Sequence, residues 1–482
     1  RSARSLSLVC SKNVLLMNMF YNFISCTAPN LGSLVYPRLL EERGSGEGRV
    51  LKINEDLTLN LKKSSVVADE FLLKSHVGHV AKHEYLDGSY LEEDLYHDAD
   101  GMASLTVSED GELQVEGMIG HKWRIKPAPK QERSSDGHLA HRLYEIGDVH
   151  SGLYYDYGAL WFKCKFECND TIFSDIYNAK MIYPELFVLV DTAFARQFRS
   201  QAKLIKYVSI TVNAMNLRYL SVSNPGVKFK LMGLEFLTRE KESFLRYIQQ
   251  RPQAIYGQQS LYALRQFVKD HEATYKPYDL VYMITGCGPF DQFKNSEVEV
   301  SPSSDWSYLF TGFAYIGTAC GDLKVGLGED RADTFEGVHV MTHEVAHIMG
   351  CPHDGDHSPS HLRGPGSSTC PFSEGYIMSY YVINLNHYKF SHCCNNQISS
   401  MSWSPLGRCL HERNANLTLK KKYSRLPGTG HTKTGQCKRA YPQVPETYYM
   451  KVLDCEMKCF MPQRVYGHET NLKLKLTDGT KC

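Results

Sequence analysis

Features that would place the chain in a simple class are missing from its 482 residues. The 54 Lys and Arg residues nearly balance the 53 Asp and Glu residues, and this net charge of +1 gives no reason to expect nucleic acid or an anionic membrane as main partner. No uninterrupted apolar run reaches the ~18 residues that a membrane-spanning helix needs. The apolar content of 42% and charged content of 22% exclude collagen, coiled-coil and disordered proteins. The composition therefore predicts a globular protein, with length for about three domains.

Cysteine is the residue type that departs most from cytosolic usage. The chain has 15 cysteines, and nine of them lie beyond residue 350. Such density is typical of proteins that fold in an oxidising compartment. The odd total leaves at least one thiol unpaired.

The first 28 residues resemble a secretory leader. Basic residues precede a mostly apolar stretch from Val14 to Ala28, which ends in a small residue near a plausible cut. The alternative is an artefactual leader followed by a buried segment. Because residue 1 is Arg, we expect that the reading frame is incomplete or that the sequence begins upstream of the true start. Two glycosylation sequons, at Asn169 and Asn416, agree with secretion.

The remaining chain divides into three regions by its hydrophobic pattern. Residues 29–172 are expected to be a β-rich N-terminal region, where Leu57, Leu59 and Leu61 alternate with polar residues. Residues 173–413 alternate buried strands, such as 186–190 and 280–284, with a helical periodicity over 201–219. This order predicts an α/β domain with a mainly parallel sheet.

The last region, residues 414–482, is basic, polar and rich in cysteine. Four cysteines, at positions 437, 455, 459 and 482, fit a small module held by disulfides. Their pairing cannot be deduced from the sequence.

The chemistry is concentrated in residues 343–354, which read HEVAHIMGCPHD. His343 and His347 are four residues apart, so on a helix they share one face and can bind one Zn²⁺. Gly350 allows the helix to end, and His353 can then supply a third imidazole. Three neutral imidazoles leave a fourth position open, which is the catalytic form of a zinc site. Glu344 is positioned to act as general base on zinc-activated water and to pass the proton to the leaving amine.

We expect this helix to begin at Asp333 as N-cap, with Glu336 three residues later as its capping-box partner. His339 lies on the same face one turn earlier, where it would pack or lie beside the ligands. Glu374 is an alternative third ligand, but it lies outside the compact motif. His357 and His361 fall in a Gly, Pro and Ser loop and are expected to be solvated.

The extended motif resembles that of the metzincin peptidases. Asp354, directly after the third histidine, points to the reprolysin (adamalysin and ADAM-like) branch. The GYIMS stretch at 375–379 is similar to the family's Met-turn, which implies that Met378 forms a hydrophobic floor under the zinc. Residues 315–321 resemble the edge strand that pairs with substrate. The overall layout is most similar to the secreted salivary reprolysins of ticks.

The resemblance implies a metzincin catalytic domain with long helices, made as a latent zymogen with a prodomain and a Cys-rich module. It implies a secreted, extracellular zinc metalloendopeptidase that cleaves extracellular proteins, such as fibrinogen, fibrin or matrix proteins. One catalytic Zn²⁺ and a structural Ca²⁺ follow from the family, although no dedicated calcium loop is found. We expect a monomer with no nucleic-acid partner.

Two other functions remain open from the sequence. A metalloprotease-like binding or adhesion protein acting on haemostasis is the main alternative, although all four motif residues are intact. An intracellular metallopeptidase is the third. Tyr380 lies where astacins carry a tyrosine ligand, but we expect it to be packed or to face substrate. A thiolate from Cys164 or Cys168 could occupy the open zinc position, although a structural disulfide is the preferred interpretation.

Overall fold

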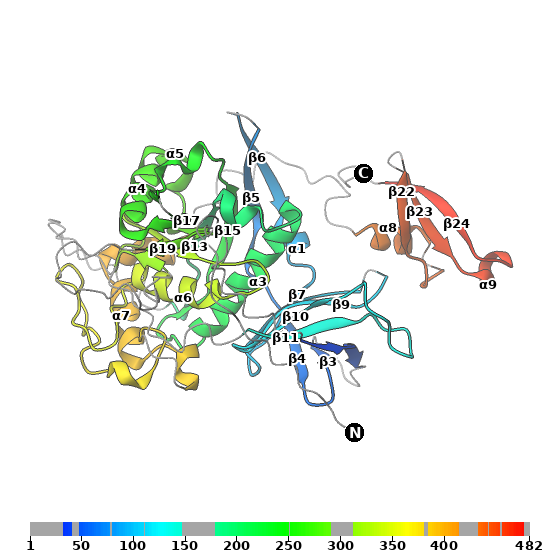
Figure 1. The fold of residues 1–482 in the computed structure, drawn as a ribbon, viewed down its shortest axis with the longest axis horizontal. Helices are drawn as coiled ribbons and strands as arrows, with labels where there is room; N and C mark the ends of the chain where they lie inside the picture. The colour runs from blue at the N-terminus through cyan, green and yellow to red at the C-terminus, as the bar shows by residue number, and fades with distance from the viewer. Residues whose placement is uncertain are drawn as a thin grey trace, which may run out of the picture.

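The computed structural model describes residues 32–40, 48–77, 80–109, 111–146, 179–249, 251–290, 312–379, 384–413, 432–441, 443–453 and 456–476. The proposed leader, both sequons, Cys164, Cys168 and Tyr380 lie outside these residues. The described part forms two large sheets with helices around one of them, and a small C-terminal sheet that lies to one side in Figure 1. This mixed arrangement confirms the expected α/β class.

The first large sheet is built from the N-terminal region and is antiparallel throughout. Its nine strands, in spatial order, are β1 (Ser33–Val35), β11 (His141–Glu145), β10 (Trp123–Pro127), β9 (Gln114–Ile119), β8 (Ala103–Ser108), β7 (Leu95–Asp98), β4 (Thr58–Lys63), β3 (Arg49–Lys52) and β2 (Arg38–Leu40). The alternation predicted around Leu59 and Leu61 is present, because both side chains are buried in this sheet's own core.

The second large sheet carries the candidate site. Its seven strands, in spatial order, are β20 (Gly312–Ala314), β21 (Val325–Glu329), β18 (Leu280–Thr285), β13 (Glu185–Val190), β15 (Lys230–Phe236), β5 (Val67–Val77) and β6 (Val80–Asp87). The four pairings between β21 and β5 are parallel, whereas the two outermost strands run antiparallel to their neighbours. The fully buried apolar run of β13 lies at its centre, as expected of a strand covered on both faces.

A hairpin from the N-terminal region thus completes the seven-stranded sheet. Strand β5 pairs in parallel with β15, and β6 forms the outer edge. Glu235 of β15 is 1% exposed, and its carboxylate lies 3.0 Å from Lys74 Nζ and 2.8 Å from His76 Nε2. The Tyr275 hydroxyl donates a third hydrogen bond to it. The two regions that the hydrophobic pattern separates therefore share one hydrogen-bonded sheet and one buried polar cluster.

Helices cover both faces of the seven-stranded sheet (Figure 1). The α-helices of this part of the chain are α1 (Gly88–Leu91), α2 (Thr192–Ala195), α3 (Gln201–Tyr219), α4 (Gly257–Asp270), α5 (Glu272–Tyr275), α6 (Gly337–Ile348) and α7 (His392–Ser402). Side chains of α3 and α6 form the core on one face, and those of α4 form the core on the other. The helical spacing predicted over 201–219 matches α3.

Helix α3 also joins the two large sheets. Leu95 and Met118 of the nine-stranded sheet belong to the same hydrophobic core as α3. The Asn213 amide donates to Ser104 Oγ at 2.9 Å, and that hydroxyl donates to the backbone oxygen of Ile210. The N-terminal sheet therefore rests on the helix that covers one face of the seven-stranded sheet.

Smaller elements complete the described chain. Two short sheets contain β12 (Met181–Ile182) with β14 (Gly226–Val227), and β16 (Tyr247–Ile248) with β17 (Arg251–Tyr256) and β19 (Gly288–Phe290). The C-terminal module contains α8 (Lys433–Ala440), α9 (Gln463–Tyr466), and the strands β22 (Tyr449–Leu453), β23 (Glu456–Met461) and β24 (Thr470–Lys475). None of the helices in the described ranges has the length and apolar character needed to cross a membrane.

Candidate active site

Helix α6 carries the first two histidines of the motif on its buried face. It begins at Gly337, four residues later than the N-cap predicted at Asp333, which instead has a left-handed backbone (φ +68°). Asp330 performs the capping role, because its Oδ1 accepts the Gly337 N–H at 3.0 Å. A Cβ on Gly337 would lie 2.4 Å from the Asp330 carboxyl carbon, so only glycine allows this approach. The predicted start was wrong because the cap comes from a strand end seven residues upstream.

The loop before α6 is held by the N-terminal sheet. Tyr144 OH donates to the backbone oxygen of Asp333 at 2.8 Å, and Lys126 Nζ lies 2.7 Å from the Asp333 carboxylate. Arg124, which is 3% exposed, donates to the backbone oxygen of Thr334. The N-terminal region therefore fixes the segment from which the active-site helix starts.

The three predicted histidines meet at one point. His343, His347 and His353 are 7%, 0% and 5% exposed, and the Nε2 atom of His353 lies 3.2 Å from the Nε2 atom of each of the other two. His343 Nδ1 donates to the Ile377 oxygen at 2.8 Å, and His347 Nδ1 donates to the Cys351 oxygen at 2.7 Å. These bonds fix the ring tautomers and leave the Nε2 lone pairs directed at the common point.

This geometry fits a zinc ion. Zn–N distances of about 2.0–2.1 Å in a tetrahedral site separate ligand nitrogens by roughly 3.3 Å, close to the spacing found here. Among the described residues, the only other group with three ligand atoms together is Cys370, His392 and Cys393, whose two sulfurs form a disulfide. Glu374, the alternative third ligand, is not part of the histidine group.

Glu344 lies beside the histidines and against the edge of the sheet. Its side chain is buried, with the residue 2% exposed. A Cβ placed on Gly312 of β20 would be 2.6 Å from Glu344 Cγ and Oε1, so the two residues are in close contact. The edge strand was predicted at 315–321, but β20 spans Gly312–Ala314 and the later residues form turns that lead to Cys320. The resemblance therefore placed this strand a few residues too late in the sequence, because the chain turns from residue 316 onward.

Asp354 connects the loop of the third histidine to residues 375–379, where the Met-turn was predicted. Its N–H donates to the Met378 oxygen at 3.0 Å, and its Oδ1 accepts the Ser391 hydroxyl at 2.5 Å. Burial raises the pKa of the Asp354 carboxyl to about 6, and the Ser391 bond acts in the opposite direction. Met378 itself is fully buried in the core that supports α6. Ser391, which caps α7, was not found from the sequence because nothing local marks it.

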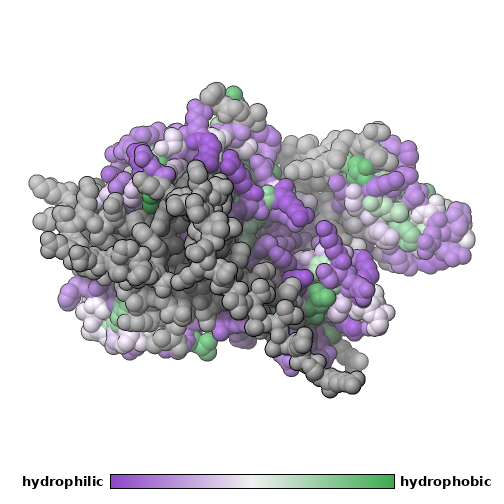
Figure 2. Space-filling view, viewed as in Figure 1, coloured by the Kyte–Doolittle hydropathy of each residue, from purple (hydrophilic) through white to green (hydrophobic). Residues whose placement is uncertain are grey.

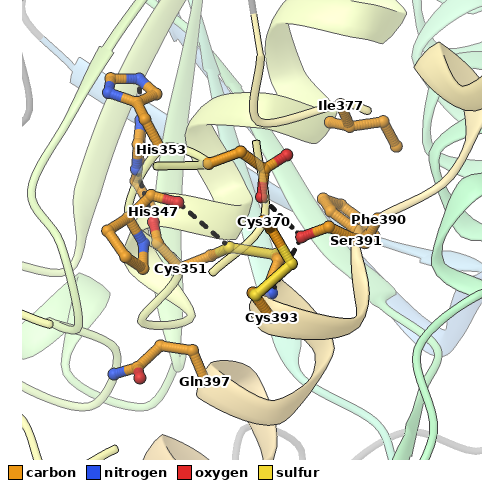
Figure 3. The surroundings of a disulfide bond; sticks show 12 residues. His347, Cys351, His353, Cys370, Ile377, Phe390, Ser391, Cys393 and Gln397 are labelled. Carbon is orange, nitrogen blue, oxygen red and sulfur yellow. Dashed lines mark hydrogen bonds between the residues drawn. A yellow bond between two sulfur atoms is a disulfide. The ribbon is translucent and has the colours of Figure 1, made fainter. Parts of the chain in front are cut away.

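Disulfides fasten the same region. Cys351 pairs with Cys394, Cys370 with Cys393, and Cys320 with Cys409. These disulfides agree with the structural role that was expected of these cysteines. Figure 3 shows His347, Cys351 and Ser391 in the surroundings of one of these disulfides. The Cys351 carbonyl that orients His347 is therefore anchored covalently to α7. Cys287 is the free, buried cysteine of the described chain, and burial raises the pKa of its thiol to about 12, so it is not a reactive thiolate.

The other histidines are not part of the triad. The ring centroid of His339 is 6.5 Å from that of His343. His361 Nε2 bonds to the Ile316 oxygen at 2.9 Å rather than being solvated as predicted, whereas His357 is exposed.

Comparison with known proteins agrees with this geometry. Residues 184–391 match the reprolysin profile of metallo-peptidase family M12. The chain is 27% identical over 336 residues to an antarease-like venom metalloproteinase of the scorpion Tityus trivittatus, covering 68% of this chain and 82% of that protein. It is 25% identical over 390 residues to the venom metalloproteinase antarease of Tityus serrulatus, covering 79% and 93%.

Other matches are weaker or carry no argument. A disintegrin and metalloproteinase with thrombospondin motifs like protein of Bombyx mori is 24% identical over 362 residues, covering 62% of this chain and 50% of that protein. Archaemetzincin from Methanopyrus kandleri aligns with 45% of this chain and 95% of its own at 16% identity, but its TM-score of 0.25 supports no conclusion. A similarity specific to tick enzymes is not shown by these matches. Residues 184–391, which contain five of the seven strands of the second large sheet, helix α6 and all three histidines, form a reprolysin-like metallopeptidase domain of family M12.

Proposed function

We propose that this protein is a secreted zinc endopeptidase that hydrolyses peptide bonds in extracellular proteins, with His343, His347 and His353 as zinc ligands and Glu344 as general base. The convergence of the three Nε2 atoms beside the buried Glu344 carries the proposal. The venom names of the scorpion relatives and the disulfides support secretion. Fibrinogen, fibrin and matrix proteins are the substrates to test first.

When bound, zinc supplies Lewis-acid polarisation of the carbonyl and lowers the pKa of water at the site. Glu344 takes the proton of the attacking water and delivers it to the leaving amine. Its place against β20 puts the carboxylate next to the strand proposed to align an extended substrate. Glu344 and the three histidines are buried, and burial strengthens the electrostatic effect of each of these side chains.

Metal content tests the ligand assignment. The purified full chain is expected to contain one equivalent of zinc, which o-phenanthroline removes. His353→Ala should lose the metal, whereas His357→Ala, an exposed histidine four residues later, should keep it. Equal zinc content in both variants would refute the assignment of His353. A structural Ca²⁺, suggested only by family resemblance, is tested in the same metal analysis.

Cleavage of fibrinogen and gelatin tests the activity. The full chain is assayed before and after limited trypsin digestion, in parallel with Glu344→Gln and with Glu374→Gln as the matched control. We expect cleavage that the chelator and Glu344→Gln abolish and that Glu374→Gln retains. Normal cleavage by zinc-loaded Glu344→Gln would show that the base is misassigned. No cleavage by any zinc-loaded protein would favour the binding-protein alternative.

A further inference from the structure

The net charge of +1 conceals a strong separation of charge along the chain. Residues 414–482 contain 13 Lys and Arg but only 5 Asp and Glu, a net charge of +8. The preceding 413 residues therefore have a net charge of −7. A short basic region attached to an acidic body is the charge pattern of an interaction module.

The described part of this region, residues 432–476, folds around a small core of its own. Helix α8 packs on the three-stranded sheet, and the Cys437–Cys459 disulfide joins α8 to β23. Met457, Cys459 and Met461 of β23 are buried in this core. The alternate residues of the same strand therefore point to the opposite face, which is not covered by α8.

That opposite face carries a row of three lysines. Lys458 on the central strand is directly paired with Lys451 on one side and with Lys473 on the other. Directly opposed residues have Cβ atoms about 5 Å apart, and like charges in such positions destabilise a sheet. Glu456 Oε2 lies 3.1 Å from Lys473 Nζ, which offsets one of the three charges. An arrangement that opposes folding in this way indicates a role in binding an anion.

An aromatic pair lies on the next row of the same face. Phe460 is two residues beyond Lys458, and its ring stacks on Tyr448 with centroids 4.9 Å apart and an interplanar angle of 20°. Tyr448 is 38% exposed. In the space-filling view, hydrophobic and hydrophilic residues occur together on the visible side of this C-terminal lobe (Figure 2). Aromatic surface beside ammonium groups suits a ligand with both apolar ring faces and negative charges.

We propose that this face, formed by Lys451, Lys458, Lys473, Tyr448 and Phe460, binds a linear sulfated polysaccharide. The sulfates of such a chain recur along a line, as the ammonium groups of the lysine row do, and the sugar rings can pack against the aromatic pair. The site requires no catalytic residue, but the choice of polysaccharide as the anion rests on the proposed secretion. Its role would be to hold the peptidase on an extracellular matrix.

Heparin and dextran sulfate are the probes, with unsulfated dextran as the negative control. The full chain is compared with the triple variant K451Q/K458Q/K473Q. The matched control, K203Q/K269Q/K276Q, removes the same charge from exposed positions on the body. We expect the module variant to bind heparin at least tenfold more weakly, and the body variant to stay within twofold of the parent.

The salt dependence and a conservative variant separate binding from folding. By analogy with phosphate contacts, each lost contact should lower the slope of log Kd against log salt by roughly 0.7–0.9. K451R/K458R/K473R should keep the parent affinity, because it preserves the charge. The proposal fails if the module variant binds like the parent, if the body variant loses as much, or if anionic phosphatidylserine vesicles bind more tightly than heparin. Binding needs no turnover, so an inactive protein with intact binding would refute only the proposed function.

Discussion

Strand β20 and the proposed general base are in such close contact that one added methyl group should disturb catalysis. A Cβ at Gly312 would lie 2.6 Å from Glu344 Cγ and Oε1, and 2.7 Å from Val340 Cγ1. Ordinary van der Waals contact to a Cβ begins at about 3.4 Å, so the carboxylate must move by about 0.8 Å. Gly312→Ala therefore changes the position of Glu344 without replacing any zinc ligand.

The size of the effect follows from that displacement. A misplacement of about 1 Å in a reacting group can lower the rate by about 10²-fold. We expect Gly312→Ala to reduce kcat for a peptide substrate by one to two orders of magnitude and to change KM less. The zinc content should remain at one equivalent, because the three atoms nearest to the new methyl group belong to Glu344 and Val340 and not to a histidine.

Gly326 on the neighbouring strand β21 provides the matched control. Its added Cβ would meet Ile348 at 3.2 Å and Tyr282 at 3.3 Å, contacts that small side-chain shifts relieve. Gly326→Ala should therefore keep kcat within about threefold. Thermal unfolding and zinc analysis of both variants separate misplacement from misfolding. A folded, zinc-loaded Gly312→Ala enzyme with kcat close to that of the parent would refute the placement of Glu344 against β20.

Three further predictions concern stability. Lys74→Met leaves the buried Glu235 carboxylate with one cation fewer and should lower the free energy of unfolding in urea by about 3 kcal/mol. Lys74→Met combined with Glu235→Gln should recover most of this stability. Equal losses of stability in the single and the double variant would contradict the pairing. Burial raises the pKa of the Asp330 carboxyl to about 7, so between about pH 4 and pH 7 this group ionises freely only in the unfolded state, and the parent should lose stability as the pH rises. The Tm of Asp330→Asn should depend less on pH in this range. Parallel curves of Tm against pH for the two proteins would contradict this assignment. Replacing Cys351 and Cys394 by alanine removes a disulfide with a sequence separation of 43 and should lower the free energy of unfolding by up to about 4 kcal/mol. It should also speed the loss of zinc to a chelator. Unchanged unfolding and unchanged metal release would contradict this prediction.

Features set by local pattern could be predicted from the sequence. The helical spacing over 201–219 coincides with α3, and the apolar run at 186–190 is the buried centre of β13. The three histidines meet because two lie one turn apart on a helix and the third follows a short turn at Gly350, which has φ +107°. In each case the determining residues are close in sequence, so periodicity and spacing contain the information.

Features set by distant residues could not be predicted in the same way. Asp330 caps α6 across a loop with two left-handed residues, and a capping-box pattern at Asp333 was the stronger local signal. Ser391 reaches Asp354 across 37 residues, and nothing near either residue marks the pair. The basic face of the C-terminal module depends on strand register, which pairs lysines that are 7 residues apart in one case and 15 residues apart in the other.

The hairpin β5–β6 is the largest case of this kind. Its apolar residues would suit either of the two large sheets, so the hydrophobic pattern assigns it to the N-terminal region in which it lies. Two residues nevertheless distinguish it: Lys74 and His76 would be costly to bury in a strand without an anionic partner. Glu235 supplies that partner from β15. The side chains of Lys74, His76 and Glu235 are all buried. Cleavage of the chain between the two regions would therefore not by itself separate them, and the N-terminal hairpin would remain part of the seven-stranded sheet.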